Sequence, residues 1–397
     1  MGHEPADWTP VHRIVFPADG DTTLLPLYLD HGAAAPTPRM DSLVFGHQRL
    51  VTTMRDSLRA EIVGSHATEV RFERSALTVA PRHRISLATY FNAFPASYWQ
   101  EHTDVDLVRL DLNVSGAARV DVFRSNARGK YVRIDSAEVD NGTASFEVAL
   151  DRFGDGGWLW FDLEAHGAPA TLTNATWSVP SGSSQRPRQR ATVAIPSFNM
   201  PAACIDQINR FAEHPEVMDS LSRIVIIDQG TSRLRDHPRF EAAASRLGSR
   251  LLVIEQPNLG GSGGFSRGML EMVKDASSDA VLLLDDDAEA EPESIIRAIR
   301  FSEFTRGPRI IGGHMLNSNE RTVLHSFGET VNWDSFWWEA VDPELSAVDF
   351  RYSSIRATPA LSRRMDVTYN GWWMCLIPRE AIEKLGLSLP YFIKWDD

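Results

Sequence analysis

The chain has 397 residues, of which 43% are hydrophobic and 23% are charged, a composition and length that suit two or three packed domains. Its 40 basic and 53 acidic residues give a formal net charge of −13, which disfavours nucleic acid as a partner because phosphate binding needs a basic surface. Cys204 and Cys375 provide neither a disulfide framework nor a zinc set. No stretch approaches the about 18 apolar residues that span a membrane, and no export signal core is expected at the N-terminus.

Residues 1–80 are expected to form a partly irregular N-terminal extension with short strands, one of them over residues 12–16. Residues 81–180 consist of short alternating apolar runs, and turn signals separate these runs at residues 115–116, 127–130, 140–142 and 154–157. This spacing predicts an all-β domain of antiparallel strands, a sandwich or jelly roll. Pro, Ser, Gly and Arg dominate residues 181–190, which is typical of a linker.

From residue 191 to residue 397 the apolar pattern changes to short continuous strands that alternate with helices. The expected strands cover residues 191–196, 223–228, 250–255 and 280–285, and the expected helices cover residues 201–213, 240–247, 265–274 and 292–304. This alternation predicts a mostly parallel, Rossmann-like α/β sheet covered on both faces. Because ligands of such sheets bind beyond the carboxyl ends of the strands, we expect the chemistry there.

The clearest local signal is Asp285-Asp286-Asp287, which follows the apolar run of the fourth strand. In extended backbone the side chains of residues i and i+2 point the same way, so Asp285 and Asp287 are expected to face one point while Asp286 turns away. Two carboxylates held close together favour a divalent cation, and oxygen ligands suit Mg²⁺ or Mn²⁺. The alternative is a solvated acidic turn that caps the next helix.

Two further segments each allow two interpretations. The pair Asp396-Asp397 beside Trp395 suits a general base and an acceptor clamp, or it is a surface turn. The glycine-rich stretch 257–264 precedes a helix but lacks the spacing of a dinucleotide or P-loop motif. It either holds a diphosphate at the helix N-terminus or is a flexible tight turn.

Aromatic residues gather late in the chain, and they suit either a core or a platform on which sugars stack. They are Trp333, Phe336, Trp337, Trp338, Tyr369, Trp372 and Trp373. His314 and His325 are candidates for a third metal ligand, although each also fits an ordinary hydrogen-bonded histidine.

A parallel sheet, an Asp-x-Asp at a strand end and a later acidic pair together resemble nucleotide-sugar glycosyltransferases of the GT-A type. From about residue 84 to the last residue the chain resembles the galactan-polymerising galactofuranosyltransferases of mycolate-type actinobacterial cell walls. The resemblance is carried, in order, by ATYFNAFPASYW (88–99), DGGWLWFD (155–162), DQG (228–230), QPNLGGSGGFSR (256–267), LDDD (284–287), YNGWW (369–373) and FIKWDD (392–397).

The resemblance implies a β-sandwich domain, a GT-A domain and a mostly helical C-terminal region. It also implies inverting transfer of galactofuranose from UDP-galactofuranose to a lipid-linked galactan acceptor in cell-wall arabinogalactan synthesis, through β-1,5 and β-1,6 linkages. This acceptor implies peripheral contact with the cytoplasmic face of the plasma membrane, and a homo-oligomer is compatible with it.

The resemblance also implies roles for individual residues. Gln229, Asn258 and Asp285 would contact the UDP moiety, and Asp285 and Asp287 would bind Mn²⁺ or Mg²⁺. Asp397 would be the general base. The sugar pocket would be shaped by Glu329, Trp338, Trp372, Trp373 and Asp396.

Two departures from the family pattern affect these expectations. The family carries Arg where this chain has Met200, and Arg267 or Arg235 are candidate substitutes. The family's metal-binding His lies beyond the position of Asp397, so we expect a fragment with one metal ligand fewer and impaired activity.

The alternatives to a galactofuranosyltransferase are another metal-dependent nucleotide-sugar transferase, an Asp-dependent phosphohydrolase or phosphotransferase, and a carbohydrate-binding fragment.

Overall fold

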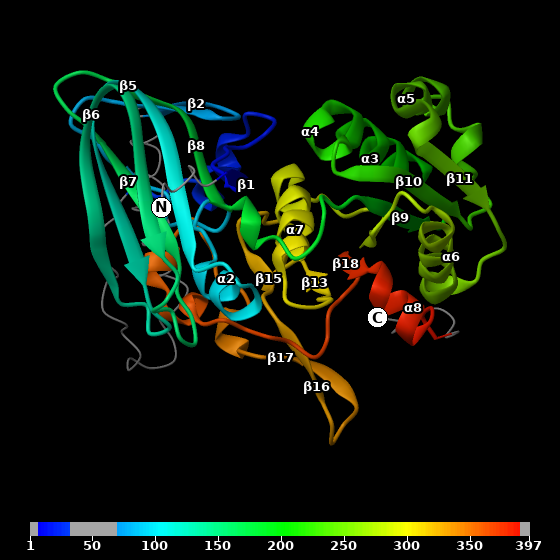
Figure 1. The fold of residues 1–397 in the computed structure, drawn as a ribbon. Helices are drawn as coiled ribbons and strands as arrows, with labels where there is room; N and C mark the ends of the chain where they lie inside the picture. Colours follow the sequence, from blue (N-terminus) through cyan, green and yellow to red (C-terminus); the bar gives the residue numbers. More distant parts are fainter. Residues whose placement is uncertain (1–6, 32–69, 390–397) are drawn as a thin grey trace, which may run out of the picture.

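The computed structural model describes residues 7–31 and 70–389, and Figure 1 shows an antiparallel sheet and an α/β sheet on either side of helix α7 (Pro292–Phe304). The antiparallel sheet has eight strands in the order β2-β3-β8-β5-β7-β4, with β1 on β8 and β6 on β5. These are β1 (Trp8–Arg13), β2 (Val70–Glu73), β3 (Ala76–Val79), β4 (Arg84–Ser86), β5 (Leu107–Ser125), β6 (Tyr131–Ala149), β7 (Leu159–Ala165) and β8 (Ala170–Pro180). The predicted antiparallel pairing is confirmed, while the two-layer packing of a sandwich or jelly roll stays a prediction because these strands hydrogen-bond into one sheet.

Strands β5 and β6 run for 19 residues each, through two positions where the sequence predicted turns. The turns predicted at residues 115–116 and 140–142 are wrong, whereas the turn at residues 127–130 joins the two strands as expected. The two mispredicted sites face each other, and the Gly116 N–H donates to Asn141 Oδ1 at 2.9 Å. Gly116 (φ +93°) and Asn141 (φ +47°) form an irregularity that bends the ladder without reversing it.

The second sheet has the order β11-β10-β9-β12-β18-β13. Its strands are β9 (Ala191–Ser197), β10 (Leu221–Asp228), β11 (Leu251–Glu255), β12 (Ala280–Leu284), β13 (Ile311–Gly312) and β18 (Met374–Pro378). Strands β9 to β12 are parallel, while β18 pairs antiparallel with both β12 and β13. The predicted mostly parallel α/β sheet is therefore confirmed, and the carboxyl ends of four strands meet at one edge.

Helices cover both faces of this sheet. They are α3 (Pro201–Glu213), α4 (Pro215–Met218), α5 (Phe240–Leu247), α6 (Gly260–Lys274), α7 and α8 (Arg379–Leu385). Val193 and Ile195 of β9 pack with α3, α4, α5 and α7, whereas Ala194 packs with α6 and α8. Helices α3, α5 and α7 begin and end at the predicted residues.

Helix α6 begins at Gly260, earlier than the predicted start at residue 265, so the prediction of a glycine-rich loop before the helix is wrong. The glycines let the helix approach the sheet. A Cβ on Gly264 would lie 2.6 Å from Pro196 Cβ, and a Cβ on Gly268 would lie 2.3 Å from Ala194 Cβ. The stretch serves close helix–sheet packing rather than loop flexibility.

Short elements complete the described chain. They are α2 (Ala96–His102), β14 (Met315–Leu316), β15 (Leu324–Ser326), β16 (Glu329–Asn332), β17 (Trp337–Ala340), and the 3₁₀ turns η1 (Thr22–Leu27), η2 (Ser181–Ser183), η3 (Leu234–Asp236), η4 (Gly248–Arg250), η5 (Pro343–Leu345), η6 (Ile355–Ala357) and η7 (Pro359–Ser362). Phe350, Ile355 and Leu361 are buried in the same cluster as β5, so late residues help to build the core of the N-terminal sheet. Within the described ranges, no helix has the length and apolarity to cross a membrane.

The segment predicted to be a linker is fixed against the end of α7. The Gln185 and Arg186 backbone N–H groups both donate to Glu303 O at 3.0 Å. The Arg186 guanidinium donates to Ser302 O at 3.0 Å and to Thr305 O at 2.8 Å. These bonds satisfy carbonyl groups that a helix end leaves unpaired, so the connection between the two sheets is held in place.

Candidate active site

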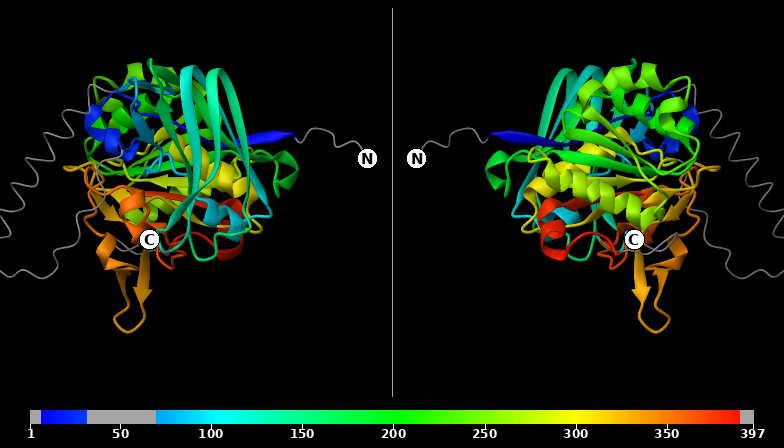
Figure 2. Two further views of the ribbon diagram at one scale, coloured as in Figure 1. Left: turned by 90° about the vertical axis from the view of Figure 1, so that its left-hand side faces the viewer. Right: turned by 90° about the vertical axis from the view of Figure 1, so that its right-hand side faces the viewer.

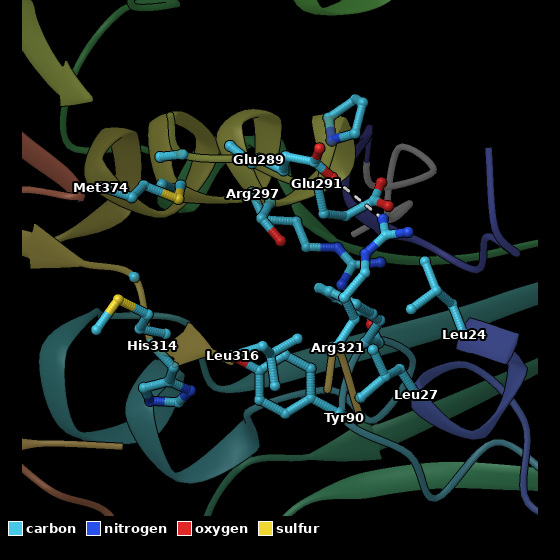
Figure 3. Close-up of a pocket in the computed structure, with 18 of the residues that line it drawn as sticks. Leu24, Leu27, Tyr90, Glu289, Glu291, Arg297, His314, Leu316, Arg321 and Met374 are labelled. Atoms are coloured by element: carbon cyan, nitrogen blue, oxygen red, sulfur yellow. Dashed lines mark hydrogen bonds and ion pairs between the residues drawn. The ribbon is translucent and has the colours of Figure 1, made fainter. Parts of the chain in front are cut away.

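A cavity of about 1210 Å³, called here the central cavity, lies between the two sheets. The N-terminal region supplies an apolar part of its wall, which includes Leu24, Leu27 and Tyr90 (Figure 3). The opposite part begins at the carboxyl end of β12 and continues into α7. Of the four strand ends where the sequence predicted chemistry, that of β12 lines this cavity, while the residues directly after β9, β10 and β11 do not. The part of the wall that the N-terminal region supplies was not predicted.

The aspartate triplet follows β12 directly, and its first and third members line the central cavity while the middle one does not. Burial raises the pKa of Asp286, and hydrogen bonding from Ser197 offsets only part of that effect. Asp287 is exposed, and no ion pair joins it to any residue in the described ranges. The prediction of extended backbone here is wrong, because β12 ends at Leu284 and residues 286–287 form a turn in which the Ala288 N–H donates to Asp285 O at 3.3 Å. The turn, not strand alternation, places the two carboxylates on one wall.

Histidines of the same cavity are candidates for completing a metal set. His314 and His325 both line the cavity, and the His314 ring centroid lies 4.3 Å from that of Phe327. Burial lowers the pKa of His314 to about 4, so its imidazole is neutral at pH 7. In the part of the chain that the structure describes, no three His, Cys, Asp or Glu side chains gather closely enough to hold a metal ion.

The predicted nucleotide contacts Gln229, directly after β10, and Asn258, just before α6, both contact the start of α6 and do not line the central cavity. The Gln229 amide accepts from the Leu259 N–H at 2.9 Å and donates to Gly260 O at 2.9 Å. Asn258 Oδ1 accepts from the Gly260 N–H at 3.0 Å. Both side chains therefore shape the α6 N-terminus, and their contact with UDP stays a prediction.

Met200, which stands where the family pattern has Arg, lies in the loop after β9. Met200 precedes α3 and is 45% exposed. The suggested substitutes are engaged elsewhere, because Arg267 pairs with Glu271 at 2.9 Å and Arg235 lies 3.6 Å from Glu255. Arg210, which sequence reasoning missed, lines the central cavity.

The predicted sugar-pocket residues are only partly brought together. Trp373 lines the central cavity and donates its indole N–H to Gly313 O at 2.7 Å. Glu329 is 8% exposed and accepts from Ser326 Oγ at 2.9 Å. Trp372 packs edge-on against Phe265, while Trp338 sits opposite Val331 in the β16–β17 hairpin, and neither lines the cavity. Asp396 and Asp397 lie outside the described residues.

A buried charged cluster beside the cavity was missed by sequence reasoning. Arg74 pairs with Glu291, and the Tyr28 hydroxyl donates to the same carboxylate at 2.5 Å. Burial would raise the pKa of Glu291, but Arg74 and Tyr28 outweigh it and lower that pKa. Arg297 donates to the Arg13 carbonyl at 2.6 Å and points toward the cavity in Figure 3. The available signal was the spacing of Glu293 and Arg297 on the apolar face of α7.

Comparisons with known proteins agree with the two-part organisation. Residues 55–180 match the model described as Galactofuranosyltransferase 2 N-terminal, and residues 187–397 match Glycosyltransferase like family 2. Galactofuranosyltransferase GlfT2 of Mycolicibacterium smegmatis is 43% identical over 82% of this chain and 51% of its own length. Galactofuranosyltransferase GlfT2 of Mycobacterium tuberculosis is 41% identical over 82% of this chain and 52% of its own length.

The chain thus spans about half the length of the curated relatives it matches. A solved mannosyltransferase from Pyrobaculum calidifontis, in complex with GDP-Man and Mn²⁺, is 13% identical over 52% of this chain and 51% of its own, with a TM-score of 0.32. That structural likeness is too low to add to the fold assignment. The family match covers the whole α/β region, and the chain belongs to glycosyltransferase-like family 2.

Proposed function

We propose that the chain transfers galactofuranose from UDP-galactofuranose to a lipid-linked galactan acceptor, with inversion and through β-1,5 and β-1,6 linkages. The names of its relatives and the family match support this proposal. The structural observation that carries it is the position of Asp285 and Asp287 on one wall of the central cavity, at the carboxyl end of β12. Ligands of open α/β sheets bind at such strand ends.

The two aspartates fit a divalent cation. Both offer carboxylate oxygens to the same cavity, and Asp287 has no cationic partner among residues 7–31 and 70–389. Such oxygens suit Mn²⁺ or Mg²⁺, which when bound would neutralise the negative charge of the departing diphosphate. Gln229 and Asn258 would fix the nucleotide at the start of α6.

The proton moves to Asp397 in this proposal. Its carboxylate takes the proton from the acceptor hydroxyl while that oxygen bonds to the anomeric carbon of galactofuranose. The bond from that carbon to the diphosphate oxygen breaks at the same time, so UDP leaves and one displacement inverts the configuration. A positioned base contributes about 10²–10⁴-fold to the rate. Glu329, Trp338, Trp372, Trp373 and Asp396 would orient the sugars.

The finer organisation belongs to the same proposal. Residues 81–180 would form a sandwich or jelly-roll domain after an N-terminal extension, and residues 191–397 would form the GT-A domain after the linker 181–190. A lipid-linked acceptor would bring the protein to the cytoplasmic face of the plasma membrane by peripheral contact.

The direct test measures UDP release from UDP-galactofuranose with a short galactofuranose acceptor and Mn²⁺. UDP-galactopyranose is the matched control donor. We expect release only with the furanose donor and the metal, and a loss of at least about 100-fold in Asp397→Ala. Metal-dependent UDP binding without transfer to any acceptor would instead leave a nucleotide- and glycan-binding protein.

A further inference from the structure

The β16–β17 hairpin extends away from the body of the molecule in all three ribbon views (Figures 1 and 2). Its outer end carries Trp333, Phe336 and Trp337, called here the aromatic tip. Their exposed fractions are 69%, 77% and 52%. Trp338, the hairpin aromatic that the resemblance assigns to the sugar pocket, lies further back on β17. Large aromatic groups gathered at one exposed point mark a contact surface.

The backbone conformation of the tip indicates that its aromatic rings form a contact surface for a ligand or partner. Phe336 adopts a left-handed conformation (φ +53°), which glycine or asparagine would adopt at lower cost. Its ring stands perpendicular to that of Trp333, with the ring centroids 6.3 Å apart. A bulky side chain kept at a strained turn position is typical of a functional site.

The hairpin is fixed in the middle of β16 and begins beside the central cavity. Thr368 Oγ1 accepts from the Val331 N–H at 3.2 Å and lies 2.6 Å from Thr330 Oγ1. Phe327, two residues before β16, lines the cavity. Four strand residues at about 3.3 Å each place the tip about 13 Å from Glu329, where β16 begins. A glycan that leaves the cavity along the hairpin would therefore need several sugar units to reach the tip.

Charge distinguishes between the possible partners of the tip. Residues 329–340 include Glu329, Asp334 and Glu339 but no Lys or Arg. An anionic membrane surface attracts basic segments, so this acidic hairpin does not suit one. A neutral glycan does suit it, because its C–H faces stack on aromatic rings and its hydroxyl groups donate to carboxylates.

We propose that the aromatic tip is an outer subsite for the glycan, which holds sugar units of the growing chain that have already left the central cavity. The identity of that glycan as galactan rests on the proposed function, whereas glycan binding by the tip does not require turnover. The subsite would favour long acceptors over short ones and would lengthen the products made before release.

The test compares the wild type with Trp333→Ala, Phe336→Ala and Trp337→Ala in binding of a β-linked galactofuranose hexasaccharide and disaccharide, without donor. We expect each substitution to weaken hexasaccharide binding about three- to tenfold and to leave the disaccharide affinity unchanged. Trp333→Tyr, which keeps an aromatic face, should restore most of the loss. Leu385→Ala, on an equally exposed (77%) side chain of α8, is the control and should change neither affinity.

Three outcomes would overturn the subsite. The first is hexasaccharide affinity that the alanine variants retain in full. The second is wild-type binding to phosphatidylcholine vesicles that the variants lose without any change in glycan binding. The third is a wild-type dimer in sedimentation that the variants dissociate, again without a change in glycan binding. Intact hexasaccharide binding by a protein that never releases UDP would contradict the proposed function while leaving the subsite standing.

Discussion

The two sheets face the same cavity but contribute different things to it. The α/β sheet ends there in charged groups, among them Asp285 and Asp287, because parallel strands deliver their carboxyl ends to one edge. The antiparallel sheet region contributes Tyr90, Phe91 and Trp99, which are large and mostly apolar. Under the proposed function, one sheet provides the chemistry while the other shapes the cavity.

Helix α7 joins the two contributions. It follows the aspartate triplet by a few residues, and its first turn carries the partners of the N-terminal region. Arg13 pairs with Glu293 at 2.5 Å, and Arg74 pairs with Glu291 just before the helix. The position of the triplet is therefore coupled to the packing of the N-terminal sheet against α7.

The variant with the largest expected effect changes the chemistry of the cavity without changing its shape. Asp287→Asn keeps the size of the side chain but removes a charge that the proposed metal requires. Transfer activity should fall at least about 100-fold, because metal stabilisation of the leaving group contributes several kcal/mol. The free energy of unfolding should stay within about 0.5 kcal/mol of the wild type, since the residue is exposed. Steady-state UDP release and urea unfolding measure the two quantities.

The matched control for that variant is Asp219→Asn, an exposed carboxylate at the end of α4. It should change neither activity nor stability. Undiminished activation of Asp287→Asn by Mn²⁺ would remove Asp287 from the metal site.

The next effect tests the coupling through α7. Glu291→Gln removes the negative charge that Arg74 and the Tyr28 hydroxyl contact. Hydrogen bonds to charged groups contribute about 1.5–3 kcal/mol, so the variant should lose stability of that order at neutral pH. Because the folded-state pKa of Glu291 is lowered, this stabilisation is complete above the ordinary value of 4.5 and disappears as the pH falls through the lowered pKa.

Urea unfolding of the wild type and Glu291→Gln at neutral and strongly acidic pH measures this difference. The gap between the two proteins should close on acidification. Asp111→Asn, which alters the half-buried Arg109 pair at 2.8 Å on β5, is the control and should cost at most about 1 kcal/mol. A gap that stays constant with pH would mean that the Glu291 charge does not stabilise the fold.

A third variant tests the close approach of α6 to its sheet. Gly268→Ala improves helix propensity by about 1 kcal/mol, but its Cβ would lie 2.3 Å from Ala194 Cβ on a buried strand. Overpacking should outweigh propensity and destabilise the protein by about 1–3 kcal/mol. Gly167→Ala, where nothing lies within 4 Å of the added Cβ, is the control and should be neutral. Equal midpoints in urea would show that α6 can shift away from the sheet.

Part of the fold could be predicted from the sequence, and part of it could not. Helices α3, α5 and α7 follow from apolar periodicity, and α3 and α7 also from Pro at the first helical position, both of which are local signals. The start of α6 does not, because glycine weakens a helix locally while packing against Pro196 and Ala194 favours it here. These contacts join residues about 70 positions apart in the sequence, so the local apolar periodicity does not indicate them.

The site divides in the same way. The apolar run of β12 indicates where the aspartate triplet begins, but Asp285 and Asp287 share one wall through a turn after Leu284 rather than through strand alternation. The cavity position of Arg210 and the pairing of Glu291 with Arg74 depend on segments far apart in sequence, so no local pattern indicates them. The hydrogen bond from the Gln229 amide to Gly260 O could likewise not be predicted, because it requires that α6 begins at Gly260.

The smallest expected effect concerns the antiparallel sheet, where two turn signals became an irregularity in a continuous ladder. Asn141→Ala places a residue without a polar side chain at φ +47° and removes the acceptor of the Gly116 N–H, so it should cost about 1–2 kcal/mol. Asn141→Gly loses the same hydrogen bond but tolerates the left-handed backbone, so it should cost about 0.5 kcal/mol. Urea midpoints that rank wild type, Gly and Ala in that order would support the bulge. If the Gly variant were as unstable as the Ala variant, the side-chain hydrogen bond rather than the backbone conformation would hold the two long strands in register.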